Sequence, residues 1–133
     1  MLTLSVLPGL FAVCRLEAGS VVPGWAMAGD FFSITRTSEE VSVVCPAAVV
    51  PPGIRHEPDW RALKVHGPLD FALTGILANL AGALAAASIS LFALSTYDTD
   101  YLLVREHTLA AAVQALTNAG HVFVDESTGH ETI

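Results

Sequence analysis

The sequence predicts an α+β fold whose second half follows the order β-α-β-β-α-β. Two helical patterns carry this prediction, because apolar residues recur at helical spacing from Leu73 to Leu84 and again from Leu109 to Leu116. Short runs rich in β-branched and aromatic residues lie before, between and after these patterns. This order of elements is that of a ferredoxin-like unit.

The predicted ferredoxin-like unit occupies residues 61–124. Its expected helices are residues 69–87 and 106–119, and Gly120 is a natural end for the second one. Its expected strands are residues 62–65, 89–95, 100–104 and 121–124. A flexible tail is expected over residues 125–133.

Residues 1–60 predict a second, degenerate unit of the same kind. Strand patterns cover residues 2–7, 10–16, 31–36 and 41–45. Pro8 and Gly9 separate the first two strands, which form either a hairpin or one strand continued after a kink. One short helical turn is expected in residues 23–29, where the other unit has a full helix. The proline-rich residues 46–58 form a connector with room for another turn.

Composition narrows the class of protein. The chain has 133 residues, of which 53% are hydrophobic and 14% are charged, so it has little charge to cover a large surface and is expected to form a homo-oligomer. The six basic residues are scattered and the formal net charge is −7, which argues against nucleic-acid binding. The apolar start of the chain lacks the positive region of a signal peptide, so a cytoplasmic location is expected.

A membrane span is the rival interpretation of residues 71–94, which carry no charge and are long enough to cross a bilayer. The pattern changes from helix to strand near Ser88, however. No cluster of Lys or Arg flanks the segment, and no aromatic belt closes it. We therefore expect a buried helix and a buried strand, with no membrane contact.

Catalytic and metal-binding motifs are not found in the sequence. The five histidines show no metal-ligand spacing with one another or with the cysteines, and no nucleophile elbow, dinucleotide fingerprint or P-loop is present. We expect a protein without enzymatic activity, metal or cofactor, although a catalytic triad is assembled in space and leaves no fixed spacing. Cys14 and Cys45 are expected to be buried free thiols, and the sequence leaves a disulfide between them open.

The distinctive polar residues lie in the turn STYDTD, at residues 95–100. Asp98 is typical of a residue that shapes a tight turn. Asp100 directly precedes an apolar strand, where a carboxylate can bind an ammonium group through charge-assisted hydrogen bonds. A calcium loop does not fit, because the later Gly and Glu of that motif are absent.

The segments GPLDFALTGI and ISLFALSTYDTDYLLVRE, set in this order of elements, resemble the ACT domain. The similarity is greatest to the ACT domains of the CASTOR-type amino-acid sensors and their bacterial relatives. It covers residues 60–124, and the first half is similar to a divergent ACT unit. The resemblance implies a regulatory module that binds an amino acid or a similar small molecule between ACT units. The sensors contain four such units in one chain and this chain has room for two, so the resemblance also implies a homodimer. The alternative is a structural or partner-binding homodimer with a vestigial pocket.

The resemblance also implies where the ligand binds. One ACT unit supplies the loop and first helical turn, residues 67–76, and another supplies the edge of the strand at residues 89–95. In the arginine sensors two acidic residues hold the ligand: one corresponds to Asp100, and the other to Leu73, where this chain departs from the sensors. The backbone at Thr74–Ile76 is expected to hold a ligand carboxylate. The expected ligand contacts are Leu73, Thr74, Gly75, Ile76, Ser90, Leu91, Asp98 and Asp100.

Overall fold

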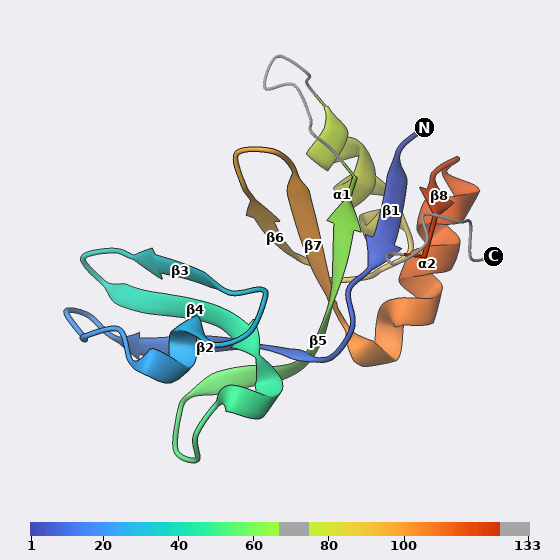
Figure 1. Ribbon diagram of the computed structural model, residues 1–133. Helices are drawn as coiled ribbons and strands as arrows, with labels where there is room; N and C mark the ends of the chain where they lie inside the picture. The colour runs from blue at the N-terminus through green and yellow to red at the C-terminus, as the bar shows by residue number, and fades with distance from the viewer. Residues whose placement is uncertain (67–74, 126–133) are drawn as a thin grey trace. The chain divides into compact units, whose positions relative to one another are not determined.

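The chain folds into two compact units in the computed structural model, and the structure describes residues 1–66 and 75–125. The N-terminal unit is Gly9–Trp60, and the C-terminal unit joins Met1–Pro8 to the chain from Arg61 onward. Within the described residues the elements are eight β-strands, two α-helices and three short 3₁₀ helices (Figure 1). This mixture confirms the predicted α+β fold class.

The C-terminal unit has the predicted order of elements, with one added strand. Its series is β5 (His56–Val65), α1 (Ile76–Ala86), β6 (Phe92–Ser95), β7 (Asp100–Arg105), η3 (Glu106–Thr108), α2 (Leu109–Asn118) and β8 (Val122–Phe123). β1 (Thr3–Val6) is the added strand, and the strands lie in the order β6-β7-β5-β1-β8. The first residues of the predicted helix, 69–74, and the predicted tail from residue 126 lie outside the described part of the chain.

Residues 1–8 correct the prediction that placed them with the first unit. β1 pairs antiparallel with β5, where Leu4 lies opposite Val65, and parallel with β8, where Leu4 lies opposite Phe123. β1 and β2 (Phe11–Glu17) do not pair with each other, which excludes the hairpin that was one of the two alternatives. Leu4 is fully buried in the core of the C-terminal unit, and this burial accounts for the position of the strand.

Both helices of the C-terminal unit pack into a single core with its strands. The fully buried helical residues are Leu80 and Leu84 of α1, and Ala112 and Leu116 of α2. From the strands, the same core contains Leu4, Leu63, Val65, Leu102, Val104 and Phe123. Burying one leucine side chain contributes about 1.5–3 kcal/mol. The core confirms the apolar stripes from which both helices were predicted.

The end of α1 explains why β6 begins three residues later than predicted. The N–H of Ser88 donates to the carbonyl of Ala85, and the N–H of Ile89 donates to the carbonyl of Leu84, both at 2.9 Å. Ser88 has a φ of +60°, so the helix ends in a Schellman motif with serine at the left-handed position that glycine usually takes. Ile89 then packs into the core, and the chain becomes a strand at Phe92.

Gly120 ends α2 with the same motif, as the sequence predicts. The N–H of Gly120 donates to the carbonyl of Thr117 at 3.0 Å, and the N–H of His121 donates to the carbonyl of Leu116 at 3.1 Å. Gly120 has a φ of +98°, which glycine adopts without steric cost.

The N-terminal unit keeps the strand order of a ferredoxin-like unit but has 3₁₀ turns in place of both helices. Its elements are β2, η1 (Gly24–Met27), β3 (Ser33–Arg36), β4 (Glu40–Pro46), η2 (Ala47–Val49) and the first half of β5. The strands lie in the order β3-β4-β2-β5, with every neighbouring pair antiparallel. The two turns lie within residues 23–29 and 46–58, where the sequence predicts them, and the unit is degenerate in the predicted sense.

The first half of β5 was predicted as a connector and is instead a strand. Phe11 lies opposite Trp60, but the register between β2 and β5 shifts beside this pair. Asp59 has a φ of +65° at this irregularity. A bulge of this kind allows a strand to continue through a proline such as Pro58, which explains why the polar sequence HEPD did not indicate a strand.

Cys14 and Cys45 are free thiols, both buried in the core of the N-terminal unit. Cys14 lies opposite Val43 and Cys45 lies opposite Ala12, so the two cysteines are diagonal neighbours on β2 and β4. Burial, and then the neighbouring Cys45, raises the pKa of the Cys14 thiol to about 12. Near neutral pH this thiol is therefore protonated and a poor nucleophile.

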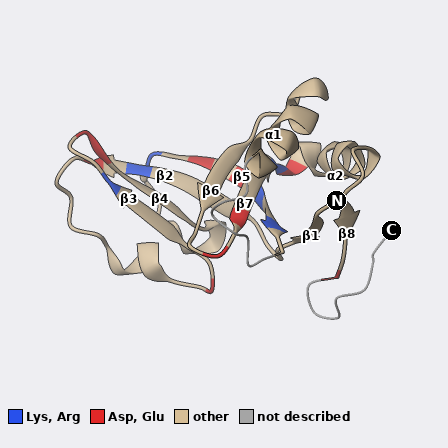
Figure 2. Cartoon of the chain, turned by 90° about the horizontal axis from the view of Figure 1, so that it is seen from above, with Lys and Arg blue, Asp and Glu red and all other residues tan. Residues whose placement is uncertain are grey.

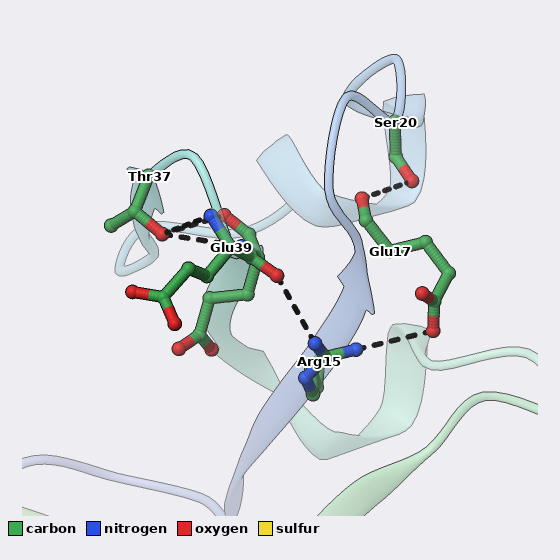
Figure 3. A network of polar contacts seen from close by, with 6 residues as sticks. Arg15, Glu17, Ser20, Thr37 and Glu39 are labelled. Atoms are coloured by element: carbon green, nitrogen blue, oxygen red, sulfur yellow. Dashed lines mark hydrogen bonds and ion pairs between the residues drawn. The ribbon is translucent and has the colours of Figure 1, made fainter.

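An exposed polar network joins two turns of the N-terminal unit (Figure 3). The guanidinium of Arg15 lies 3.1 Å from the carboxylate of Glu17 and donates to the carbonyl of Glu39 at 3.1 Å. The hydroxyl of Ser20 donates to the carbonyl of Glu17, and the hydroxyl of Thr37 accepts from the N–H of Glu39. Exposed ion pairs contribute little to the free energy of unfolding. We therefore assign this network a local role, which is to fix the conformation of the two turns.

His121 fastens β1 to α1. The N–H of Leu2 donates to Nδ1 of His121 at 3.1 Å, and Nε2 lies 2.9 Å from Oδ1 of Asn79. Because Nδ1 accepts a hydrogen bond, Nε2 carries the proton and donates to Asn79. Burial, and then the positive charge of the amino terminus, lowers the pKa of His121. The neutral imidazole is thus the form that the fold requires.

Ser88→Gly should stabilise the protein by about 1 kcal/mol, because a non-glycine residue in the left-handed region costs about 1–2 kcal/mol. The expected rise in the thermal midpoint is about 3–5 °C, measured by circular dichroism. Gly120→Ala is the matched control at the equivalent position of α2, where an added Cβ meets no atom within 4 Å. It should lower the midpoint, since φ alone is strained there. A fall in midpoint for Ser88→Gly would contradict this account.

Acid should destabilise the C-terminal unit through His121. Its pKa is lowered on folding, so the unfolded chain binds the proton more readily. The favourable contribution is therefore complete above the ordinary pKa of about 6.5 and is lost as the pH falls below it. Urea denaturation of the parent and of His121→Asn at pH 7.5 and at pH 5.5, about two pH units apart, measures this loss of stability.

The asparagine of His121→Asn keeps an acceptor for the N–H of Leu2 but does not titrate. We expect a smaller loss of stability on acidification than in the parent. His107→Asn, at an exposed position, should retain the loss seen in the parent. Equal losses in the parent and in His121→Asn would show that His121 does not carry the effect.

Candidate functional site

The polar residues predicted from the sequence lie in the β6–β7 turn, on the side of the C-terminal unit where α1 begins (Figure 1). The hydroxyl of Thr99 donates to the carbonyl of Val65, the last residue of β5. Thr99 is 7% exposed, so this bond is shielded from water. The bond fastens the turn to the point at which the chain leaves β5 on its way to α1.

The turn is also closed from within by Thr96 and Thr99. The N–H of Thr96 donates to the carbonyl of Thr99 at 2.8 Å, and the N–H of Thr99 donates to the hydroxyl of Thr96 at 3.2 Å. The same hydroxyl lies 3.2 Å from the carbonyl of Thr99. These bonds leave the turn few alternative conformations, so the strand residues on either side of it are held at fixed positions.

Asp100 is the first residue of β7, and its carboxylate is held by β6. It lies directly opposite Ser95, whose hydroxyl donates to Oδ1 of Asp100 at 2.6 Å. Asp100 is partly buried and lies on the same face of the strand as Leu102 and Val104, because alternate residues share a face. This is the face that the helices cover, since Leu102 and Val104 belong to the core that includes α1 and α2.

No basic side chain of the described residues pairs with Asp100. Arg15 pairs with Glu17 and Arg61 pairs with Glu106, and Asp100 takes no part in either ion pair. α1 itself carries no charge, as its tan colour in Figure 2 shows. A partly buried carboxylate with a hydroxyl partner and no cation is suited to a cationic group from outside the chain.

α1 begins without a side-chain cap from the described residues. Gly75 occupies the cap position with a φ of +80°, and Ile76 is the first helical residue. The N–H of Asn79 donates to the carbonyl of Gly75 at 2.8 Å, so the N–H groups of the preceding turn have no partner within the helix. No acidic residue lies in this first turn of α1, where the positive end of the helix dipole favours an anion.

The other predicted contacts are placed differently. Asp98 is exposed in the turn and takes no part in the hydrogen bonds that close it. Ser90 is exposed and Leu91 is partly buried, and both precede β6, so the prediction that they lie on a strand is wrong. Residues 87–91 instead close the end of α1 and bring Ile89 into the core. Leu73 and Thr74 lie outside the described residues.

Two absences concern only the part of the chain that the structure describes. Over that part, no three side chains of His, Cys, Asp or Glu are grouped as metal ligands. Over the same part, neither helix combines the length and the apolar character that crossing a membrane requires.

Comparison with known proteins identifies the family. The model of the ACT domain matches residues 55–118, and a separate model of an N-terminal domain matches residues 9–53. A protein of Agrobacterium tumefaciens, known from its X-ray structure, is 38% identical, with a TM-score of 0.89 over 98% of each chain. The chain is an ACT-domain protein.

Other relatives agree with this assignment. The human cytosolic arginine sensor for mTORC1, subunit 1, is 41% identical over 58 residues, which are 43% of this chain and 18% of the sensor. The chain thus matches less than a fifth of that relative's length. The regulatory subunit of aspartate kinase from Thermus thermophilus is 12% identical in sequence. Its structural alignment covers 88% of this chain and 96% of that subunit, with a TM-score of 0.60. This last likeness shows the fold alone.

The ACT match contains the β6–β7 turn and the start of α1, which are the two parts of the candidate site. Sequence reasoning selected Asp100 and Gly75 but missed the role of Thr99. It placed residue 95 in the predicted turn without connecting Ser95 to Asp100. The available signal was the pattern of hydroxyl residues at 95, 96 and 99 around the turn, since such side chains commonly bond to nearby backbone.

Thr99→Val should destabilise the ACT domain by about 1–3 kcal/mol, because it leaves the carbonyl of Val65 without its hydroxyl donor in a buried position. Chemical denaturation gives the measurement. Thr99→Ser, which keeps the hydroxyl, is the control and should lose less stability than the valine variant. If the valine variant were as stable as the parent, the hydrogen bond from Thr99 to Val65 would make no contribution to the free energy of unfolding.

Proposed function

We propose that this ACT-domain protein is a regulatory module that binds an amino acid, with Asp100 and the start of α1 as the protein's side of the site. The observation that carries the proposal is the partly buried carboxylate of Asp100, which Ser95 holds and which no basic side chain of the described residues neutralises. Its position on the helix-covered face, near the end of β5, leaves it available to a ligand rather than to a structural ion pair.

An amino acid complements both parts of this site. Its ammonium group would bind the Asp100 carboxylate through charge-assisted hydrogen bonds. Its carboxylate would accept from the uncapped N–H groups that follow Gly75, where the helix dipole favours negative charge. The remaining predicted contacts, Thr74 and Leu73 before the helix and Ser90 and Leu91 before β6, belong to this proposal as surroundings of the ligand.

The name of one relative supports a regulatory role. The human protein is named as a cytosolic sensor of arginine, and this name does not describe catalysis. We therefore propose sensing in the cytoplasm, without chemical conversion of the ligand and without a cofactor.

A second copy of the chain would complete the site. ACT units bind their ligands between units, and a chain that is 53% hydrophobic has surface to bury in a homodimer. Binding would regulate a partner when two packings of the dimer differ in their affinity for the ligand, because a ligand shifts an equilibrium only by that difference.

A thermal-shift screen against the common amino acids tests this proposal. A ligand at about 100 times its dissociation constant adds about 2.7 kcal/mol, which raises the midpoint by several degrees. For the amino acid that binds, Asp100→Asn should weaken binding about 10-fold or more in titration calorimetry, because it removes the charge from the hydrogen bond to the ammonium group.

Asp98→Asn is the matched control, since Asp98 lies in the same turn but is exposed. It should bind as the parent does. Full binding by Asp100→Asn would place the ligand elsewhere, and failure of every amino acid to shift the midpoint would favour a structural homodimer.

A further inference from the structure

The hydrogen bond between Ser95 and Asp100 bears on which cation the site accepts. Ser95 and Asp100 face each other across the last rung of the β6–β7 ladder before the turn. At 2.6 Å, the hydroxyl of Ser95 is at the short distance typical of an O–H donor to a charged carboxylate. One of the two acceptor positions of Oδ1 is therefore already occupied by a donor of the protein.

The geometry of the turn keeps that bond in place. Thr96 and Thr99 close the turn, and the hydroxyl of Thr99 fastens it to Val65. The backbone on both sides of the Ser95–Asp100 pair is thus fixed. Rotation of the carboxylate to present both oxygens equally would break a charge-assisted hydrogen bond.

The bond from Ser95 affects two kinds of cation differently. A guanidinium group binds best through two parallel N–H groups, one to each carboxylate oxygen, and on Oδ1 it would share the negative charge with the Ser95 hydroxyl. A primary ammonium is a compact charge with rotatable donors and needs one oxygen. In the described residues Oδ2 has no hydrogen-bond partner, so it is the oxygen that suits an ammonium group.

We infer that Ser95 is a specificity-determining positioning residue, which donates to Oδ1 of Asp100, weakens that oxygen as the acceptor of a second donor, and so favours ligands that present a primary ammonium over ligands that present a guanidinium. This inference rests on the proposed function, because it concerns the same carboxylate. It assigns the ligand to amino acids whose ammonium group meets Asp100. The side-chain hydroxyl of Ser95 acts through Asp100 and does not itself need to touch the ligand.

Glycine and guanidinoacetate are the matched probes for this test. Each carries one carboxylate and one cationic group on the same methylene, and they differ in that cation alone. Titration of the full chain, followed by the amide signals of Gly75, Ile76, Ser95 and Asp100 in nuclear magnetic resonance spectra, gives both dissociation constants. The parent should bind glycine about tenfold more tightly than guanidinoacetate.

Ser95→Ala should reduce this ratio to near one, by weakening glycine and by freeing both oxygens for the guanidinium. Ser95→Thr keeps a hydroxyl at a strand position and should restore the ratio. A merely structural role for Ser95 would weaken both probes equally and leave the ratio unchanged, and that result would overturn the inference.

Asp100→Asn separates this inference from the proposed function. If it abolishes binding of both probes while Ser95→Ala leaves the ratio unchanged, the site stands and the role of Ser95 is wrong. If it binds both probes as the parent does, the proposed site itself fails, and the inference fails with it. Binding of neither probe by the parent, up to their solubility limits, would also overturn both.

Discussion

The structure depends on one strand, β5, whose ten residues supply hydrogen bonds to both units. Its first residues pair with β2, and its last pair with β1 and β7. The same strand positions the candidate site, because the carbonyl of Val65 accepts the bond that fastens the β6–β7 turn. A one-residue slip of β5 would turn Leu63 and Val65 away from the core. The pairing register of β5 thus determines both the packing of this core and the position of Asp100.

Local signals in the sequence predicted the elements that depend on neighbours in the chain. The apolar stripes gave α1 and α2, and Gly120 gave the end of α2, because both depend on contacts a few residues apart. The place of β1 depends on pairing with Val65 and Phe123, which no local period encodes. The start of β6 was misplaced because Ser88 takes a left-handed conformation that usually belongs to glycine.

The candidate site shows the same division. Asp100 and Gly75 were predicted because the resemblance to ACT domains carried them, residue by residue. The partnership of Ser95 with Asp100 follows from the β6–β7 register, and that of Thr99 with Val65 follows from the meeting of two segments 34 positions apart. Hydrogen bonds of this kind decide how a carboxylate is presented, and a sequence pattern does not show them.

The position of β1 has a consequence for the synthesis of the protein. Its hydrogen bond from Leu2 to His121 spans 119 positions, and Leu4 lies opposite Phe123. A chain that leaves the ribosome amino terminus first can pair β1 with β5 as soon as β5 has emerged, but the other edge of β1 stays unpaired until β8 follows. Residues 9–60 have their strand partners among themselves and can fold meanwhile. The N-terminal unit would thus have all its strands early, and the sheet of the C-terminal unit would be complete only after β8 has emerged.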